Sequence, residues 1–288
     1  MSGTWQSGAV APTASVGAAG WLRLIWRGTL LGLLVFGGLL VLLVLRLIER
    51  PLWRQHRPFT PFIAQFVSRG AFVIMGLKFT VQGTPMAGLG AVVANHSSWL
   101  DIFALNARNR IYFVSKAEVA GWPGIGWLAR ASGTVFIRRR SSEAGLHRDI
   151  IGARLKAGHR LVFFPEGTST DGIRVLPFKS SLFEAFFMSG LRADMSIQPV
   201  TVVYRAPDGE ATDFYGWWGD MDMAPHLLKI LASRRQGAVA LCYHPPVRVC
   251  DFADRKALAK ACEATVRAGV RAGLSGQNTG MPVAVLSQ

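Results

Sequence analysis

The chain has 288 residues, enough for one large domain or two small ones, and half of them are hydrophobic. Its 32 basic and 17 acidic side chains give a formal net charge of +15, which favours anionic partners, but we find no nucleic-acid-binding motif and expect no nucleic-acid partner. The three cysteines, Cys242, Cys250 and Cys262, have neither CxxC nor metal-ligand spacing, so we expect free thiols and no metal site.

The N-terminal part of the chain is the most apolar. Residues 1–20 are rich in Gly, Ala, Ser and Thr and predict a disordered tail. The run from Gly28 to Leu45 then contains no charged residue, which is long enough for a membrane-spanning or deeply inserted helix. A second apolar stretch over residues 59–77 is interrupted by a proline, a serine, an arginine and a glycine, which favours an interfacial or re-entrant helix over a core helix. We therefore predict a membrane-anchoring helical segment over residues 21–78.

Arginines flank the long apolar run on both sides. Those before it are Arg23 and Arg27, and those after it are Arg46, Arg50, Arg54 and Arg57. The larger downstream group favours a span followed by a cytoplasmic domain, hence an inner (cytoplasmic) membrane protein; a segment that enters and leaves one face is the alternative. Beside such an anchor, an anionic membrane is the partner that the basic surface favours.

From about Lys78 onward, short β-type runs alternate with helical stretches. We predict strands over residues 79–81, 91–94, 111–114, 134–137, 161–164, 198–204, 239–243 and 247–249. We predict helices over residues 99–107, 122–131, 142–156, 182–189, 225–232 and 255–272. This alternation predicts an α/β domain over residues 79–275, with helices packed on a mostly parallel sheet, and residues 276–288 form a loose tail.

A histidine and an aspartate five residues apart follow the second predicted strand, in the segment NHSSWLD at positions 95–101. Five residues turn a helix by about 500°, so the two side chains meet only if His96 lies in the turn before a helix, with Ser97 or Ser98 as the helix cap. There Asp101 accepts the Nδ1 proton and leaves Nε2 free to act as a base. The alternative is a capping box, in which Asp101 only satisfies a backbone N–H.

Three further segments carry side chains that a plain scaffold does not need. GTVFIRRR (133–140) ends a strand in three arginines, whose planar groups suit a phosphate or carboxylate; a solvated or membrane-facing basic run is the alternative. FFPEGTST (163–170) places Glu166, able to bind a hydroxyl or ammonium, beside Gly167, where backbone can approach a ligand; an ordinary turn with an exposed Glu is the alternative. In IQPV (197–200) a proline enters a hydrophobic strand, which predicts a sheet edge or a strand start.

In their order and spacing, NHSSWLD, GTVFIRR, FFPEGTST and IQPVTVVY resemble the four motifs of the glycerolipid acyltransferase family, over residues 80–205. The chain looks most similar to bacterial 1-acylglycerol-3-phosphate acyltransferases and their lyso-ornithine lipid branch. The resemblance implies a membrane-bound enzyme with an N-terminal hydrophobic anchor and an α/β catalytic domain. Such an enzyme transfers a fatty acyl group from acyl carrier protein or coenzyme A to the hydroxyl of a lysolipid, with no further cofactor and no metal.

The resemblance also implies roles for single residues. His96 is the general base and Asp101 fixes its tautomer. The arginines after the fourth predicted strand bind the anionic head of the lysolipid, the turn after the fifth shapes the acceptor site, and the proline lines the pocket. These substrate-binding residues are Arg138, Arg139, Glu166, Gly167, Thr168 and Pro199.

The acceptor expected from the resemblance is 1-acylglycerol-3-phosphate, which gives phosphatidic acid. Phosphatidate-forming members usually read EGTR in the third motif, whereas here Ser169 follows Thr168. The missing arginine leaves room for an acceptor with another head group, such as lyso-ornithine lipid, although Lys179 is a candidate for a compensating charge.

Two functions of other kinds stay open. One is a non-catalytic, membrane-tethered protein whose basic face recruits an acidic partner. The other is a hydrolase that uses water in place of the lipid hydroxyl, although no GxSxG nucleophile elbow is found. The tryptophan-rich segment over residues 214–220 fits a membrane interface or a packed core, and we predict no catalytic role for it.

Overall fold

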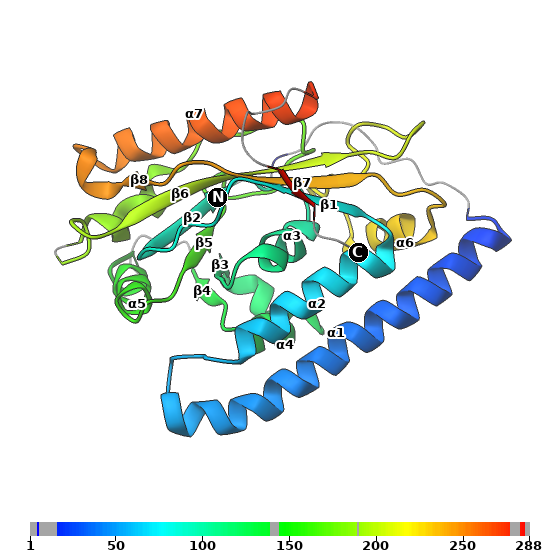
Figure 1. Cartoon of the computed structure of the whole chain (residues 1–288), viewed down its shortest axis with the longest axis horizontal. Coiled ribbons are helices and arrows are strands. Elements are labelled where there is room, and N and C mark those ends of the chain that lie inside the picture. The colour runs from blue at the N-terminus through cyan, green and yellow to red at the C-terminus, as the bar shows by residue number, and fades with distance from the viewer. Residues whose placement is uncertain (1–4, 6–15, 139–143, 189, 277–282, 286–288) are drawn as a thin grey trace.

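The structure is a computed structural model that describes residue 5 and residues 16–138, 144–188, 190–276 and 283–285. Helices cover both faces of one central sheet, and a long helical hairpin precedes the sheet (Figure 1). An α/β fold with N-terminal apolar helices is therefore confirmed. The helices are α1 (Ala18–Trp53), α2 (Thr60–Met75), α3 (Leu100–Arg108), α4 (Ile125–Ser132), α5 (Ala144–Lys156), α6 (Met223–Ala232) and α7 (Arg255–Leu274), with 3-10 helices η1 (Ala117–Gly121), η3 (Ser180–Phe187) and η4 (Val249–Asp251).

Within the described residues, the strands form one sheet in the order β4-β3-β5-β2-β6-β7-β1-β9, with β8 paired to β6. They are β1 (Lys78–Gln82), β2 (Gly90–Ala94), β3 (Tyr112–Lys116), β4 (Val135–Ile137), β5 (Leu161–Phe163), β6 (Ser196–Arg205), β7 (Ala238–Tyr243), β8 (Val247–Arg248) and β9 (Val283–Val285). The run from β4 to β6 is parallel, whereas β7 is antiparallel to β6. The carboxyl ends of the five parallel strands therefore share one edge, where open α/β sheets place their sites.

Each face of the sheet has its own hydrophobic core. One core joins β2 to α2, α3 and α6, and the other joins it to α5, η3 and α7. Figure 1 shows α7 on one side of the sheet and α1, α2 and α3 on the other. Alternate residues of β2 enter the two cores, and every residue of this strand is buried, as expected for a central strand covered on both faces.

Two expectations about the sheet are wrong. Pro199 lies neither at an edge nor at a strand start, because β6 is a central strand between β2 and β7. The proline stands where β6 changes its antiparallel partner from β8, at residues 196–197, to β7, at residues 200–205, so its missing N–H falls at the break between two ladders. The tail predicted to be loose contains β9, which pairs with β1.

One expected helix also differs in type. At residues 182–189 we expected an α-helix, and the structure has the 3-10 helix η3.

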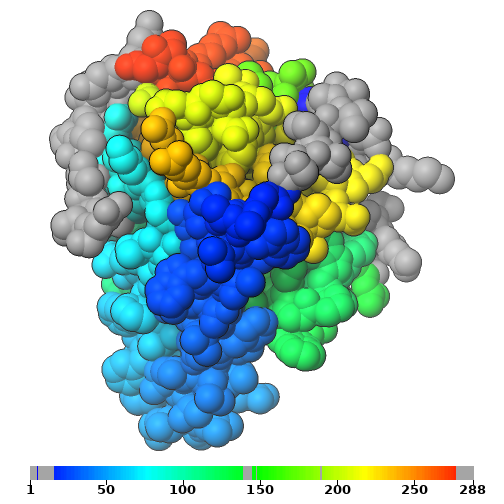
Figure 2. All heavy atoms as spheres, turned by 90° about the vertical axis from the view of Figure 1, so that its right-hand side faces the viewer, coloured from blue at the N-terminus to red at the C-terminus, as the bar shows by residue number. Residues whose placement is uncertain are grey.

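The hairpin is made of α1 and α2, and its turn projects beyond the body of the domain (Figure 2). By length and composition, α1 is long and apolar enough to cross a membrane. One face of α1 packs on α2, α4 and α6. The other face exposes large apolar side chains, including Leu22, Trp26, Leu33, Leu40 and Leu47.

Arginines of the hairpin attach it to the α/β domain at the C-termini of three helices. Arg27 donates to the carbonyls of Leu231 and Ser233 at the end of α6 (3.1 and 2.7 Å). Arg57 donates to Ala131 at the end of α4 (2.6 Å), and Arg69 donates from Nε to Ala107 near the end of α3 (2.8 Å). The last carbonyls of a helix lack intrahelical partners and carry partial negative charge. A guanidinium there donates the missing hydrogen bonds and offsets the charge. The arginines that flank the apolar run thus hold helices of the domain in place.

A buried carboxylate fixes the corner between α1 and α2. Glu49 is 0% exposed, and its oxygens accept from the backbone N–H groups of Phe59 and Thr60, from the Thr60 hydroxyl and from Arg46. Glu49 therefore caps the first turn of α2 from the preceding helix.

We expect Glu49→Ala to lower the free energy of unfolding by about 2–4 kcal/mol, because two backbone N–H groups, one of them buried, and a hydroxyl lose their acceptor. The measurement is unfolding of the purified protein in detergent micelles, followed by circular dichroism. Glu210→Ala, at an exposed position, is the control and should change little. Equal stability of the two variants would contradict this account of the corner.

Candidate active site

The turn after β2 is held by the side chain of Asn95. Its amide donates to the carbonyl of Val202 and accepts from the N–H of the same residue, both at 2.8 Å. Asn95 thus acts as one more strand partner for β6 beyond the end of β2. The turn that follows carries His96, and α3 begins at Leu100, so His96 lies outside the helix as predicted.

Asp101, in the first turn of α3, accepts from the His96 ring. Its Oδ2 lies 2.7 Å from His96 Nδ1 and also accepts from the backbone N–H groups of Ser97 and Ser98 (2.8 and 3.0 Å). The two interpretations of the motif are therefore both realised by one carboxylate, which orients the ring and caps the helix. The expected serine cap is wrong: the Ser98 hydroxyl has no hydrogen-bond partner among the described residues.

The imidazole of His96 is fixed and still accessible. It stacks on the ring of Phe164, with 4.1 Å between ring centroids and 16° between planes, and its side chain is 20% exposed. No residue in the described part of the chain makes a hydrogen bond to Nε2. With Nδ1 bonded to Asp101, Nε2 carries the free lone pair, which is the atom that a general base needs.

The loop after β5 holds the backbone of His96. Glu166 accepts the His96 N–H on Oε1 (2.8 Å) and the Leu176 N–H on Oε2 (2.6 Å). Thr170 donates its own N–H to the His96 carbonyl (2.9 Å). Glu166 is 1% exposed, and this burial raises its pKa from 4.5 to about 8, against the effect of its two backbone donors. Glu166 therefore ties the loop to the turn of His96.

The predicted substrate residues are placed as follows. Gly167, with a positive φ of 78°, and Thr168 form the turn beside β2 that the motif predicted. Arg138 follows β4 at the same sheet edge, three strands from His96, which is about 14 Å at ordinary strand spacing. Arg139 lies outside the described residues. Pro199 is buried in the sheet, level with Val93, and no contact in the described part joins it to His96.

Several residues around the site were not singled out by the sequence. Phe164 and Thr170 stand inside the third motif, but their roles depend on how the loop meets the turn. Trp217, in the aromatic segment, donates its backbone N–H to the carbonyl of Ser97 (2.8 Å). Trp99 donates its indole N–H to Nδ1 of His226 on α6 (2.9 Å), whose pKa is lowered to about 4 by burial. These contacts join segments far apart in sequence.

Comparison with known proteins agrees with this geometry. Residues 79–203 match the family model described as Acyltransferase. The chain is 55% identical to the lyso-ornithine lipid O-acyltransferase of Rhodobacter capsulatus, over 92% of this chain and 96% of the relative. A protein of the same name from Brucella abortus is 37% identical, over 78% and 85%. A 1-acyl-sn-glycerol-3-phosphate acyltransferase of Neisseria gonorrhoeae is 31% identical, over 62% and 68%.

The fold also has a solved counterpart. The crystal structure of the 1-acyl-sn-glycerophosphate (LPA) acyltransferase PlsC from Thermotoga maritima matches with a TM-score of 0.63 at 22% identity, over 90% of this chain and 98% of that chain. Fold and family match define the class of protein, an acyltransferase with an apolar N-terminal helix and an α/β domain. More particularly, the chain belongs to the family of the lyso-ornithine lipid and 1-acyl-sn-glycerol-3-phosphate O-acyltransferases, which confirms the predicted family.

We expect the loss of thermal stability caused by Glu166→Gln to become smaller as the pH rises. Folding raises the pKa of the Glu166 carboxyl from 4.5 to about 8. Between these two pH values the unfolded chain releases this proton and the folded protein keeps it, so the folded state becomes less stable as the pH rises. Glutamine does not titrate, so the thermal midpoint of the wild type should fall towards that of the variant between pH 5 and pH 9. Glu118→Gln, at an exposed position, is the control. A gap that widens with rising pH would contradict the assignment.

Proposed function

We propose that this protein acylates the free hydroxyl of lyso-ornithine lipid and so forms ornithine lipid. The observation that carries the proposal is the His96–Asp101 pair in a partly exposed turn, within a chain whose relative at 55% identity is named for this reaction. Of the two acceptors that the sequence suggested, the relatives over most of the chain favour lyso-ornithine lipid over 1-acylglycerol-3-phosphate.

The proposed reaction needs one proton to move out and back. Nε2 of His96 takes the proton of the lipid hydroxyl. At the same time the hydroxyl oxygen attacks the carbonyl carbon of the fatty acyl thioester of acyl carrier protein or coenzyme A. Asp101 stabilises the resulting imidazolium through Nδ1. As the carbon–sulfur bond breaks, the imidazolium returns the proton to the leaving thiolate, so the base is regenerated.

The loop next to His96 offers an exposed guanidinium, which matches the carboxylate of an ornithine head group. Ornithine linked through its α-nitrogen presents a carboxylate and an ammonium. Arg174, with its side chain 55% exposed, is paired with Asp171 at 2.9 Å (Nε–Oδ2), and Thr170 joins the carbonyls of His96 and Arg174 through its hydroxyl. Ser169, where an arginine would favour a phosphate, is buried. The guanidinium of Arg174 can bind the carboxylate of such a head group, and the serine at position 169 weakens the case for a phosphate monoester.

For the membrane we propose that the hairpin lies along one face of the bilayer, the inner face of the cytoplasmic membrane. A helix of 36 residues is about 54 Å long, well beyond the roughly 30 Å of a hydrocarbon core. Yet Arg23 and Arg27 near its start contact α6, and Arg57, just after its end, contacts α4 of the same domain. Contacts at both ends favour an in-plane helix whose exposed apolar face enters the lipid.

The activity test uses purified enzyme in detergent micelles with acyl carrier protein and coenzyme A thioesters. We expect faster acylation of lyso-ornithine lipid than of lysophosphatidate, measured by mass spectrometry of the diacyl products. His96→Ala should reduce turnover by about 10²–10⁴-fold with the fold intact, whereas His56→Ala, at an exposed histidine, should not. Near-wild-type turnover of His96→Ala would defeat the mechanism, and exclusive use of lysophosphatidate would defeat the acceptor.

The topology test places single cysteines at both ends of α1, at Gly17 and at Gln55, after replacing the three native cysteines. A membrane-impermeant maleimide should label both sites from the side that labels Ser275→Cys in the domain, in sealed vesicles of either orientation. Labelling of the two ends from opposite sides would show that α1 spans the bilayer.

A further inference from the structure

The two oxygens of the Asp101 carboxylate have different partners. Oδ2 receives His96 Nδ1 and two backbone N–H groups. Oδ1 receives the hydroxyl of Tyr204 at 2.7 Å, from a strand 103 residues further along the chain. The buried carboxylate therefore faces the histidine on one side and a phenol on the other.

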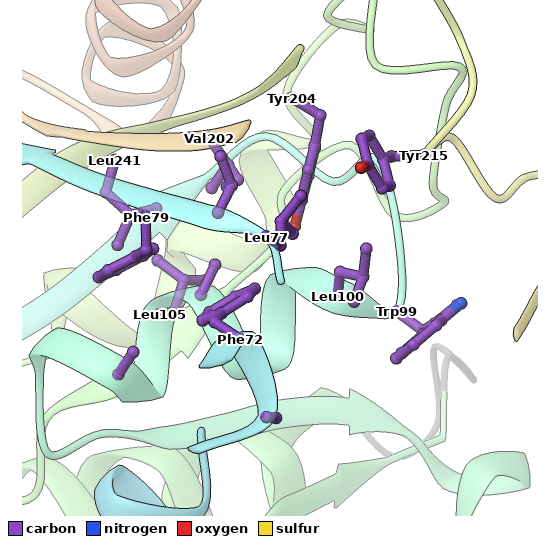
Figure 3. Close-up of a cluster of buried hydrophobic side chains, with 14 of the residues drawn as sticks. Phe72, Leu77, Phe79, Trp99, Leu100, Leu105, Val202, Tyr204, Tyr215 and Leu241 are labelled. Atoms are coloured by element: carbon purple, nitrogen blue, oxygen red, sulfur yellow. The ribbon is translucent and has the colours of Figure 1, made fainter. Parts of the chain in front are cut away.

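Tyr204 is placed by the sheet and by a packed neighbour. It stands on β6 two residues after Val202, whose backbone is bonded to Asn95, so one strand positions both the turn of His96 and the phenol. Figure 3 shows Tyr204 extending towards the start of α3, where Leu100 lies, with Tyr215 beside it. The ring centroids of Tyr204 and Tyr215 are 5.7 Å apart. The phenol therefore has little freedom to turn away from Asp101.

The phenol stays protonated and acts as a donor. Burial and the charge of Asp101 raise the pKa of Tyr204 well above its usual value of 10. The hydrogen bond from this neutral phenol stabilises the negative charge of the Asp101 carboxylate. The carboxylate then stabilises the imidazolium form of His96 less strongly than it would without the bond. The strength of this one hydrogen bond thus affects how readily His96 releases a proton.

We propose that Tyr204 is a positioning residue of the acyl transfer, acting through Asp101 to hold the carboxylate in line with His96 and to set the basicity of His96. This inference rests on the proposed role of His96. The other titratable groups near the pair are Glu166, which bonds the His96 backbone, Tyr215, which packs on Tyr204, and His226, which lies behind Trp99. Only Tyr204 and His96 donate side-chain hydrogen bonds to Asp101 among the described residues.

The test is Tyr204→Phe, with Tyr215→Phe as the matched control. Tyr215 is also buried, and its hydroxyl bonds Gln236 and the N–H of Gly237, so the control removes a buried phenol hydroxyl without touching Asp101. For Tyr204→Phe we expect kcat/KM to fall about tenfold and the acid limb of its pH profile to move up by roughly half to one pH unit, because imidazolium gains stability. Tyr215→Phe should keep the wild-type profile even where its thermal midpoint falls.

A second measurement keeps the inference testable without turnover. A ¹⁵N NMR titration of His96 follows its pKa directly, and it should rise in Tyr204→Phe and stay unchanged in Tyr215→Phe. Replacing Tyr204 with 3-fluorotyrosine, a more acidic phenol, strengthens the bond and should lower the His96 pKa. Equal His96 pKa values in all these proteins would overturn the role of Tyr204. Absence of activity in the wild type, with the expected shifts still present, would overturn the proposed function alone.

Discussion

The architecture of the site follows from one buried charge, the carboxylate of Asp101. A carboxylate with no exposure to water is costly unless each oxygen is bonded. Here Asp101 lies at the start of α3, and its four donors come from two other elements, the turn after β2 and the strand β6. None of these elements can shift without leaving a lone pair of Asp101 unsatisfied. The cost of burial is therefore what makes the position of the His96 ring so well defined.

The hairpin belongs to the same framework. Its arginines cap the C-terminal ends of α3, α4 and α6, and two of these helices support the site directly. The N-terminal end of α3 carries Asp101, and α6 carries His226, which receives the indole of Trp99 next to the turn. The apolar hairpin is thus bonded to the catalytic domain at several points, and contacts of its outer face with lipid would act on helices that hold the site.

Local features of this site were readable in the sequence, and distant ones were not. The spacing of His96 and Asp101 requires a turn before a helix, which the structure has, and the strands and helices of the domain lie close to their predicted positions. The bonds from Tyr204 to Asp101 and from Asn95 to Val202 depend on the register between β2 and β6, which no local pattern encodes. Pro199 was misplaced for the same reason, because its tolerance in a central strand depends on a change of partner. The arginines that flank the apolar run fit two roles, contact with anionic lipid and hydrogen bonding to the last carbonyls of helices. The sequence alone favoured the first role, and the structure shows the second for Arg27 and Arg57.

On the proposed function, the chemistry and the choice of acceptor are carried by different groups. The ring and backbone of His96 are held by Asp101, Phe164, Glu166 and Thr170, and the last three belong to one loop. The guanidinium of Arg174, whose side chain is 55% exposed and which is paired with the buried Asp171, makes none of these bonds. A change of residues 169–174 on the exposed side can therefore alter the head group that is accepted while the base keeps its geometry. The relatives of this chain differ in their named acceptors, as such a separation between the base and the acceptor-binding groups allows.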